Sequence, residues 1–286
     1  MDYIKLLRVK HYIKNLLVFF PLIFGGFLFN ITIIMKVSMG FLAFCCMSSV
    51  IYIVNDIKDV EKDRQHEKKK YRPIASGKVS IKKAYIIAII LFIVSIIINI
   101  LSFKENVVSI VILLTYFAIN MVYSVFNGKR IPILDIVLLV SGFVLRLYYG
   151  AVISDIEVSE WLTLVIISGS SYLAFGKRRN ELIKNQDTTR EVLQFYSQNF
   201  LDKSMYSCMT LAIVFYSLWC MDKNQRGTSN FLITVPILMI ILFKYSMDIE
   251  CVSKIDGDPV DVIISDKVLI ILVFILAVVL GFLIYF

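Results

Sequence analysis

The sequence predicts an all-α integral membrane protein, a nine-helix transmembrane bundle with a cytoplasm-facing central cavity. Three observations lead there: the apolar content, the number of long apolar runs and the distribution of basic residues. Of the 286 residues, 58% are hydrophobic and 18% are charged, and the mean hydropathy is +0.78. A soluble domain of this size does not carry so apolar a sequence. The bilayer is therefore the expected solvent for most of the chain.

Nine apolar runs approach the ~20 residues that a membrane-spanning helix needs. They lie at about residues 16–34, 38–55, 83–101, 107–126, 132–153, 160–176, 204–221, 229–247 and 267–286. No stretch remains for a soluble domain, so we expect residues 1–286 to form a single membrane domain.

The first 15 residues are expected to form an interfacial helix rather than a secretion signal, because no small-residue cleavage site follows them and eight further spans do. Its lipid side would carry Ile4, Leu6 and Leu7, and its head-group side would carry Lys5, Arg8 and Lys14. The five cysteines show neither disulfide nor metal-ligand spacing, and we interpret them as small buried hydrophobic residues.

The basic residues predict the orientation. With nine spans and a cytoplasmic N-terminus, 24 of the 30 Lys and Arg residues fall on the inside and four on the outside. This asymmetry is the positive-inside signal of a multi-pass protein of the cell membrane. The net charge of +8 is thereby explained by topology, and no nucleic-acid partner is needed.

The expected inside ends of spans two, four, six and eight are all polar. They read NDIKDVEKD, YSVFNGKR, GKRRNEL and DGDPVDVIISD. An Asp, Lys or Arg at the centre of a membrane helix costs about 2.5–3.5 kcal/mol on insertion scales. A shared cavity facing the cytoplasm would remove much of that cost, so we expect the functional site there.

The most informative segment, residues 55–77, follows the second span. Asp56, Asp59, Asp63, His66 and Lys70 are three or four positions apart, which places them on one face if the segment is helical. Such carboxylates suit Mg²⁺, which takes one or two carboxylates together with substrate phosphates. A solvated helix of mixed charge is the alternative interpretation.

A dense basic run, HEKKKYR, follows the acids. Its lysines, Lys69 among them, are also explained by topology or by attraction to lipid head groups. Arg72 differs, because Pro73 restricts its backbone to extended conformations. A guanidinium fixed near the carboxylates is a suitable phosphate clamp.

Two further groups of polar residues lie near the ends of spans four and six. The first contains Tyr123, Ser124, Lys129 and Arg130, with Asp135 at the start of the next span; the second contains Lys177, Arg178, Arg179 and Glu181. A basic loop with an Asn-Gly turn and a stop-transfer signal are the alternatives. Asp135 is expected to be a helix-dipole partner or a further ligand. Lys177 and Glu181 can pair, which would leave Arg178 or Lys177 free for an anion.

Arg146 lies well inside the fifth span, where an ionisable residue indicates function unless it has a structural partner. The sequence has no Gly-rich phosphate loop, no Ser-His-Asp spacing and no Cys/His metal pattern. With two histidines in the chain, acid–base chemistry based on His has little to use.

The run Asn55, Asp56, Asp59, Asp63 resembles the NDxxDxxxD motif of the UbiA superfamily of intramembrane transferases. Members have nine transmembrane helices and move a prenyl group from a prenyl diphosphate to an aromatic or lipid acceptor. They carry a second Asp-rich motif after the sixth helix, where this chain has GKRRNEL instead.

That replacement resembles the decaprenyl-phosphate phosphoribosyltransferase branch of the superfamily. KNLLVFFPL, which starts at Lys14 and Asn15, is similar to that branch, as are DRxHxxKxxRPIAxG, SGFVLR ending at Arg146 and GDPVDV starting at Gly257. Glu67 stands where a Pro is usual. The resemblance implies Mg²⁺-dependent transfer of 5-phosphoribose from phosphoribosyl diphosphate to a polyprenyl phosphate.

The residue roles follow from both lines of reasoning. We expect Asp56, Asp59 and Asp63 to hold Mg²⁺ and, with Asp135, to serve catalysis. The expected substrate-binding residues are Lys14, Asn15, Asn55, His66, Lys69, Arg72, Tyr123, Lys129, Arg146, Lys177, Arg178 and Glu181. An ordinary prenyltransferase is the first alternative, and a transporter or flippase is the second. Acids gathered at one membrane face, rather than near the midplane, argue against transport.

Overall fold

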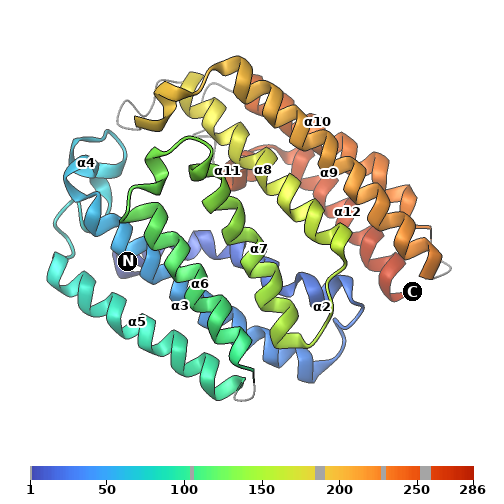
Figure 1. Cartoon of the computed structure of the whole chain (residues 1–286), viewed down its shortest axis with the longest axis horizontal. Coiled ribbons are helices and arrows are strands. Elements are labelled where there is room, and N and C mark those ends of the chain that lie inside the picture. The colour runs from blue at the N-terminus through green and yellow to red at the C-terminus, as the bar shows by residue number, and fades with distance from the viewer. Residues whose placement is uncertain (1, 104–105, 184–190, 227–229, 252–258) are drawn as a thin grey trace. The chain divides into compact units, whose positions relative to one another are not determined.

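The computed structural model describes residues 2–103, 106–183, 191–226, 230–251 and 259–286 (Figure 1). Within these ranges the regular elements are all helices. The chain divides into two compact units: unit 1 comprises residues 1–129 and 141–158, and unit 2 comprises residues 130–140 and 159–286. Helix α7 (Leu134–Ser154) contributes its first turns to unit 2 and the rest to unit 1.

Unit 1 begins with three short helical segments, α1 (Asp2–Leu7), the 3₁₀ helix η1 (Val9–Phe19) and α2 (Phe20–Phe24). The long α3 (Ile31–Lys58) follows. The expected break between residues 34 and 38 is therefore wrong. The chain turns instead at residues 25–30, where Gly26 has a φ of +83° and the Asn30 side chain caps α3 by accepting from the Ile33 N–H.

The N-terminal segment also differs from the expected interfacial helix. Arg8 has a φ of +53°, a left-handed conformation that separates α1 from η1. Leu6, expected to face lipid, is fully buried and packs with Val50 and Ile53 of α3. Ile4 is exposed, as expected. The segment therefore packs against α3 through Leu6, while Ile4 remains on its exposed apolar face.

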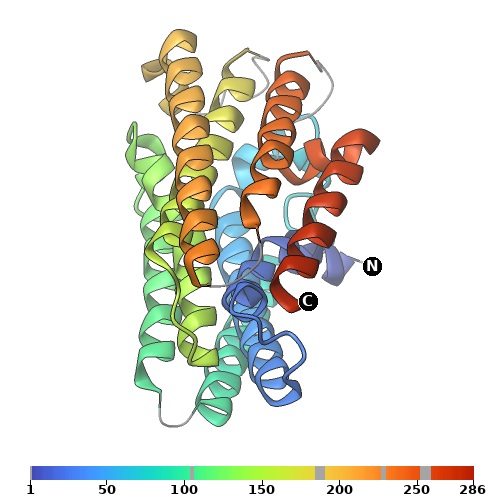
Figure 2. The same ribbon diagram turned by 90° about the vertical axis from the view of Figure 1, so that its right-hand side faces the viewer.

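Helices α3, α5 (Ile81–Ser102) and α6 (Val107–Ser124) lie side by side in unit 1, as both ribbon views show (Figures 1 and 2). Their core includes Phe44 and Tyr116, whose rings contact each other, and Phe44 also contacts Tyr149 of α7. Gly150 lies directly against the backbone of Val18, where a Cβ would stand 2.1 Å from the Val18 carbonyl oxygen. This close approach holds η1 against α7.

Unit 2 is built from α8 (Glu160–Ile183), α9 (Gln198–Arg226), α10 (Thr234–Cys251) and α12 (Lys267–Tyr285). The short segments η4 (Glu191–Phe195), η5 (Phe231–Ile233) and α11 (Pro259–Ser265) connect them, while η3 (Gly128–Arg130) lies before α7. Tyr172, Met205, Tyr245 and Ile249 lie in its core, where α8, α9 and α10 meet.

Seven of the described helices are long and apolar enough to cross a membrane. They are residues 31–58, 81–102, 107–124, 134–154, 198–225, 231–250 and 267–285. Of the two other expected spans, 16–34 is interrupted by the turn at residues 25–30, and 160–176 forms part of α8, whose last turns are charged. The all-α membrane class is confirmed, and the count of nine stays a prediction.

The surface agrees with a lipid environment. Ile86, Ile89 and Ile93 of α5 are each at least half exposed, and Phe274 of α12 is 66% exposed. Soluble monomers rarely expose contiguous apolar surfaces of this kind. The helices therefore present apolar faces suited to lipid.

Candidate active site

The acidic motif spans the junction of α3 and α4 (Val60–Gln65). Asp59 lies between them with near-helical backbone, and the Asp63 N–H donates to the Asp59 carbonyl at 2.8 Å. The helical path therefore continues from Asp56 to Asp63, and both residues are at least 96% buried. The row stops at His66, whose backbone is extended and whose Nδ1 accepts from the Lys68 N–H.

Arg72 joins the first and last carboxylates of the motif. Its Nη1 donates to Asp56 Oδ1 at 3.1 Å and to Asp63 Oδ2 at 2.6 Å. Its ψ of 146° is the extended conformation that Pro73 requires. The restriction seen in the sequence thus places this guanidinium against the acids.

Arg8 is a member of the site that sequence reasoning missed. It was expected to face lipid head groups, but its Nη2 donates to Asp56 Oδ1 at 2.5 Å. Its guanidinium also lies 4.9 Å from the centre of the Tyr52 ring, a cation–π contact. No sequence spacing links Arg8 to a carboxylate 48 positions away.

The middle carboxylate has its own cation. Lys129 Nζ donates to both oxygens of Asp59, at 2.9 and 2.7 Å. The turn at Asn127, which has a φ of +63°, leads into Lys129, and Lys58 of α3 donates to Asn127 Oδ1. The structure thus brings Lys129 to the motif, and its expected contact with substrate stays a prediction.

The carboxylates at Asp56 and Asp63 fit a divalent cation. One oxygen of each carboxylate accepts from the same nitrogen of Arg72, so the positively charged guanidinium group already lies between them. Among the described residues, no three His, Cys, Asp or Glu side chains converge as a ready metal site. Two carboxylates are nevertheless the usual protein contribution to Mg²⁺ when substrate phosphates supply further oxygens.

Unit 2 contains a separate buried cluster around Arg178. Its Nε donates to Asp135 Oδ2 and its Nη1 to Glu181 Oε2, both at 2.7 Å, and Arg178 is 1% exposed. Two carboxylates therefore hold Arg178 in this structure, and its expected contact with a substrate anion stays a prediction. Asp135 is fully buried and acts as the counter-ion of Arg178.

Tyr196 completes this cluster. Its hydroxyl donates to Asp135 Oδ1 at 2.7 Å and accepts from the Ile133 N–H at 2.6 Å. Burial, and then the hydrogen bond to Asp135, raise the pKa of Tyr196 to about 12 despite the opposing Ile133 contact. Ile133 has a φ of +67°, which is strained for a β-branched residue. The hydrogen bond to Tyr196 helps to hold that conformation.

Arg146 lies in a third network, within unit 1, whose hydrogen-bond acceptors are uncharged groups. Its side chain donates to Asn15 Oδ1 at 2.8 Å, to the Gly142 carbonyl and to the Tyr116 hydroxyl. The guanidinium also lies over the rings of Phe44 and Tyr116. Asn15, expected to bind substrate, is 1% exposed and donates to Cys45 Sγ. Both residues thereby tie η1 to α3, α6 and α7.

Six other expected site residues are half-buried: Lys14, Asn55, Lys69, Tyr123, Lys177 and Glu181. Their expected role in substrate binding stays a prediction. Gly257 and Asp258 of the GDPVDV segment lie outside the described residues.

The fold and the site define an α-helical, multi-pass membrane protein with a carboxylate motif at the end of a spanning helix. Residues 18–180 match the model of the UbiA prenyltransferase family. The chain belongs to this family and is a membrane transferase.

Two decaprenyl-phosphate phosphoribosyltransferases match nearly the whole chain. A decaprenyl-phosphate phosphoribosyltransferase of Corynebacterium glutamicum is 35% identical over 93% of this chain and 81% of its own length. The protein of the same name from Mycolicibacterium smegmatis is 33% identical over 94% and 88%. A digeranylgeranylglyceryl phosphate synthase of Saccharolobus solfataricus is 36% identical, but over 46% of this chain and 44% of its own length.

Solved structures share the fold. A UbiA homologue from Archaeoglobus fulgidus, bound to GPP and Mg²⁺, has a TM-score of 0.74 at 19% identity and covers 99% of both chains. A UbiA homologue from Aeropyrum pernix has a TM-score of 0.68 at 14% identity and covers 95% of this chain and 98% of its own. At these identities the likeness concerns the fold alone.

Proposed function

We propose that the protein transfers the 5-phosphoribosyl group from phosphoribosyl diphosphate to a polyprenyl phosphate and releases diphosphate. The observation that carries the proposal is the match, over more than nine-tenths of the chain, to two phosphoribosyltransferases at 33–35% identity. The charge pattern supports it, because a donor with phosphate at both ends and a phosphate acceptor need more cations than a prenyl diphosphate does.

Asp56 and Asp63 are the proposed cation ligands, and Asn55 and Asp59 support them. The chemistry supplied by Mg²⁺ bound there would be neutralisation of charge on the departing diphosphate. Arg72 changes from carboxylate partner to phosphate ligand when substrate enters. Lys129 keeps Asp59 in place and adds positive charge next to the motif.

The proposed transfer forms a bond between an acceptor phosphate oxygen and the anomeric carbon of ribose and breaks the bond between that carbon and the diphosphate oxygen. The acceptor phosphate is already an anionic nucleophile, so the site needs no strong general base. Cations placed before the reaction stabilise the developing charge. We assign Asp135 to holding Arg178 in position rather than to contact with the reacting atoms.

The proposed setting is the cell membrane, with the N-terminus and the acidic motif at the cytoplasmic side and nine membrane crossings. The support is the distribution of basic residues, 24 of 30 on one side. Labelling single introduced cysteines with an impermeant reagent in intact cells tests this orientation. Labelling of a residue in the loop that contains Lys69 from outside would overturn it.

The function is tested with purified protein, labelled phosphoribosyl diphosphate and a polyprenyl phosphate. We expect a labelled lipid that the Asp56→Asn variant does not form. A parallel reaction supplies prenyl diphosphate and an aromatic acid, because the family model also covers prenyl transfer. Prenylation without phosphoribose transfer would replace the proposal. Lipid movement in sealed vesicles without a covalent product would indicate a transporter.

A further inference from the structure

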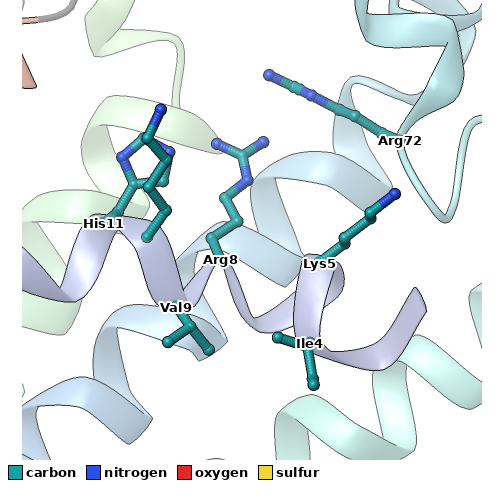
Figure 3. Close-up of a pocket in the computed structure, with 7 residues that line it drawn as sticks. Ile4, Lys5, Arg8, Val9, His11 and Arg72 are labelled. Carbon is teal, nitrogen blue, oxygen red and sulfur yellow. The ribbon is translucent and has the colours of Figure 1, made fainter. Parts of the chain in front are cut away.

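Unit 1 contains a pocket of about 400 Å³ on the N-terminal segment, within the size range of small-ligand sites (Figure 3). It is lined by Ile4, Lys5, Arg8, Val9, Lys10, His11 and Arg72. The lining contains four Lys or Arg side chains and one His, and no acid. Such a lining attracts an anion.

The pocket and the acidic motif share two side chains. Arg8 and Arg72 line the pocket, and both donate to the same oxygen, Oδ1 of Asp56. In the close-up, Arg8 extends upward from the N-terminal segment and Arg72 extends toward it from the upper right, so their guanidinium groups point toward the same space (Figure 3). The pocket therefore lies next to the proposed cation ligands and is joined to them through two charged side chains.

The backbone of Arg8 supports a functional placement. Its left-handed conformation is strained for a residue other than glycine. The His11 N–H donates to the Arg8 carbonyl at 2.8 Å, and the Arg8 N–H donates to the Lys5 carbonyl at 3.2 Å. The surrounding contacts thus hold a strained residue so that its side chain reaches both Asp56 and the pocket.

The charges around the pocket indicate how it would respond to a divalent cation. Two guanidinium groups, from Arg8 and Arg72, now balance the two carboxylates of Asp56 and Asp63. A divalent cation on those carboxylates would leave both guanidinium groups uncompensated. Lys5 would add to that excess, and a phosphate carries the charge and acceptor geometry that guanidinium groups bind best.

We propose that this pocket binds a phosphate group of a substrate, and that Arg8 exchanges Asp56 for that phosphate as the divalent cation takes the carboxylates. The inference rests on the proposed function for its substrates: the phosphate belongs to the soluble donor or to the lipid acceptor. Phosphate and cation then bind with positive coupling, and each raises the affinity for the other by the same factor.

Binding measurements test the pocket without turnover. The full-length protein in detergent is titrated with inorganic phosphate and diphosphate by calorimetry, and with Mn²⁺ by electron paramagnetic resonance. We expect Arg8→Gln to weaken phosphate binding at least about 10-fold, since it removes a charge-assisted hydrogen bond. The same variant should bind Mn²⁺ several-fold more tightly without phosphate, because Asp56 loses a competing cation.

Lys82→Gln is the matched control, since Lys82 is an exposed basic residue of α5 outside the pocket. It should bind both ligands as the unmodified protein does. Lys5→Gln is a second variant that lines the pocket without touching Asp56, and it should weaken phosphate binding without tightening Mn²⁺ binding. If Arg8→Gln and Lys5→Gln bind phosphate as tightly as the control, the proposal is wrong.

Steady-state kinetics then identify the source of the phosphate. A raised KM for phosphoribosyl diphosphate in Arg8→Gln assigns the pocket to the donor, and a raised KM for polyprenyl phosphate assigns it to the lipid. Failure of the proposed function would show as no phosphoribose transfer by the unmodified protein. The binding titrations do not depend on that reaction, so the two failures are distinguishable.

Discussion

A single nitrogen of Arg72, Nη1, lies between Asp56 Oδ1 and Asp63 Oδ2, at 3.1 and 2.6 Å. The two carboxylates are seven positions apart, two turns along a helix, and would repel each other at this separation without a cation. Arg72 therefore keeps the acids of the motif together, in an arrangement that a divalent ion can take over.

Replacing Arg72 by Lys should lower kcat/KM by about 10- to 100-fold, which corresponds to about 1.4–2.8 kcal/mol of transition-state stabilisation. The charge is kept, but the flexible lysine side chain lacks the rigid guanidinium that holds Nη1 between the two carboxylates. Arg64→Lys is the control, because Arg64 is on α4 and pairs with the exposed Glu61. Equal losses in the two variants would contradict a specific role for Arg72.

Arg178→Met should destabilise the protein strongly, by about 3–5 kcal/mol, because Asp135 would remain buried as an unpaired charge. Thermal unfolding in detergent measures this as a lowered Tm. The double variant Arg178→Met, Asp135→Leu should recover much of the loss, since both charges are then gone. Lys203→Met, at an exposed position of α9, should leave Tm almost unchanged. No recovery in the double variant would argue against the pair.

Gly150→Ala should lower Tm, because the added Cβ would stand 2.1 Å from the Val18 carbonyl oxygen and backbone cannot turn away. Overpacking of this kind costs about 1–3 kcal/mol. Gly169→Ala in α8 is the comparison, as a Cβ there meets nothing within 4 Å. It should be neutral or stabilising by up to about 1 kcal/mol, the helix-propensity difference. Similar Tm values for the two variants would refute the close approach of η1 and α7.

Asp266 gives a pH dependence. Its hydrogen bond with Lys244, and then the N–H groups of Leu269 and Val268 at the start of α12, hold its pKa below the usual 3.8. Because the folded pKa lies below the unfolded one, the carboxylate stabilises the fold above pH ~4 and loses that effect as pH falls through the folded value. Asp266→Asn should lower Tm at pH 7 and flatten the decline of Tm on acidification. An unchanged acid profile would contradict this.

The helical membrane class and several spans were predictable because a helix in lipid must be continuously apolar, a property of neighbouring residues. The runs at 83–101 and 107–126 correspond to α5 and α6 within a few residues. The error at residues 34–38 has a local cause. The loop expected between residues 34 and 38 contains Lys36, but Lys36 lies in the second turn of α3, and the chain turns at the glycines before Asn30.

The candidate site was predictable in part. The three aspartates and the extended Arg72 follow from short-range spacing and from Pro73, and both are local constraints. Arg8 was misjudged and the acid partners of Arg178 were not foreseen, since a basic residue near a membrane face is compatible with lipid, substrate or a distant acid. Sequence alone does not choose among these partners, because each cation is attracted to every acid.

By itself, the sequence determined that this protein is a helical membrane protein and that three acids share one stretch of helix. Both follow from hydropathy and helical periodicity, which depend on residues close together in the chain. Tertiary structure decided which cation meets which acid. Those pairs join residues 48, 70 and 43 positions apart, for Arg8–Asp56, Lys129–Asp59 and Arg178–Asp135. Coulomb attraction is undirected, so only the packing of the helices within each unit selects the partner.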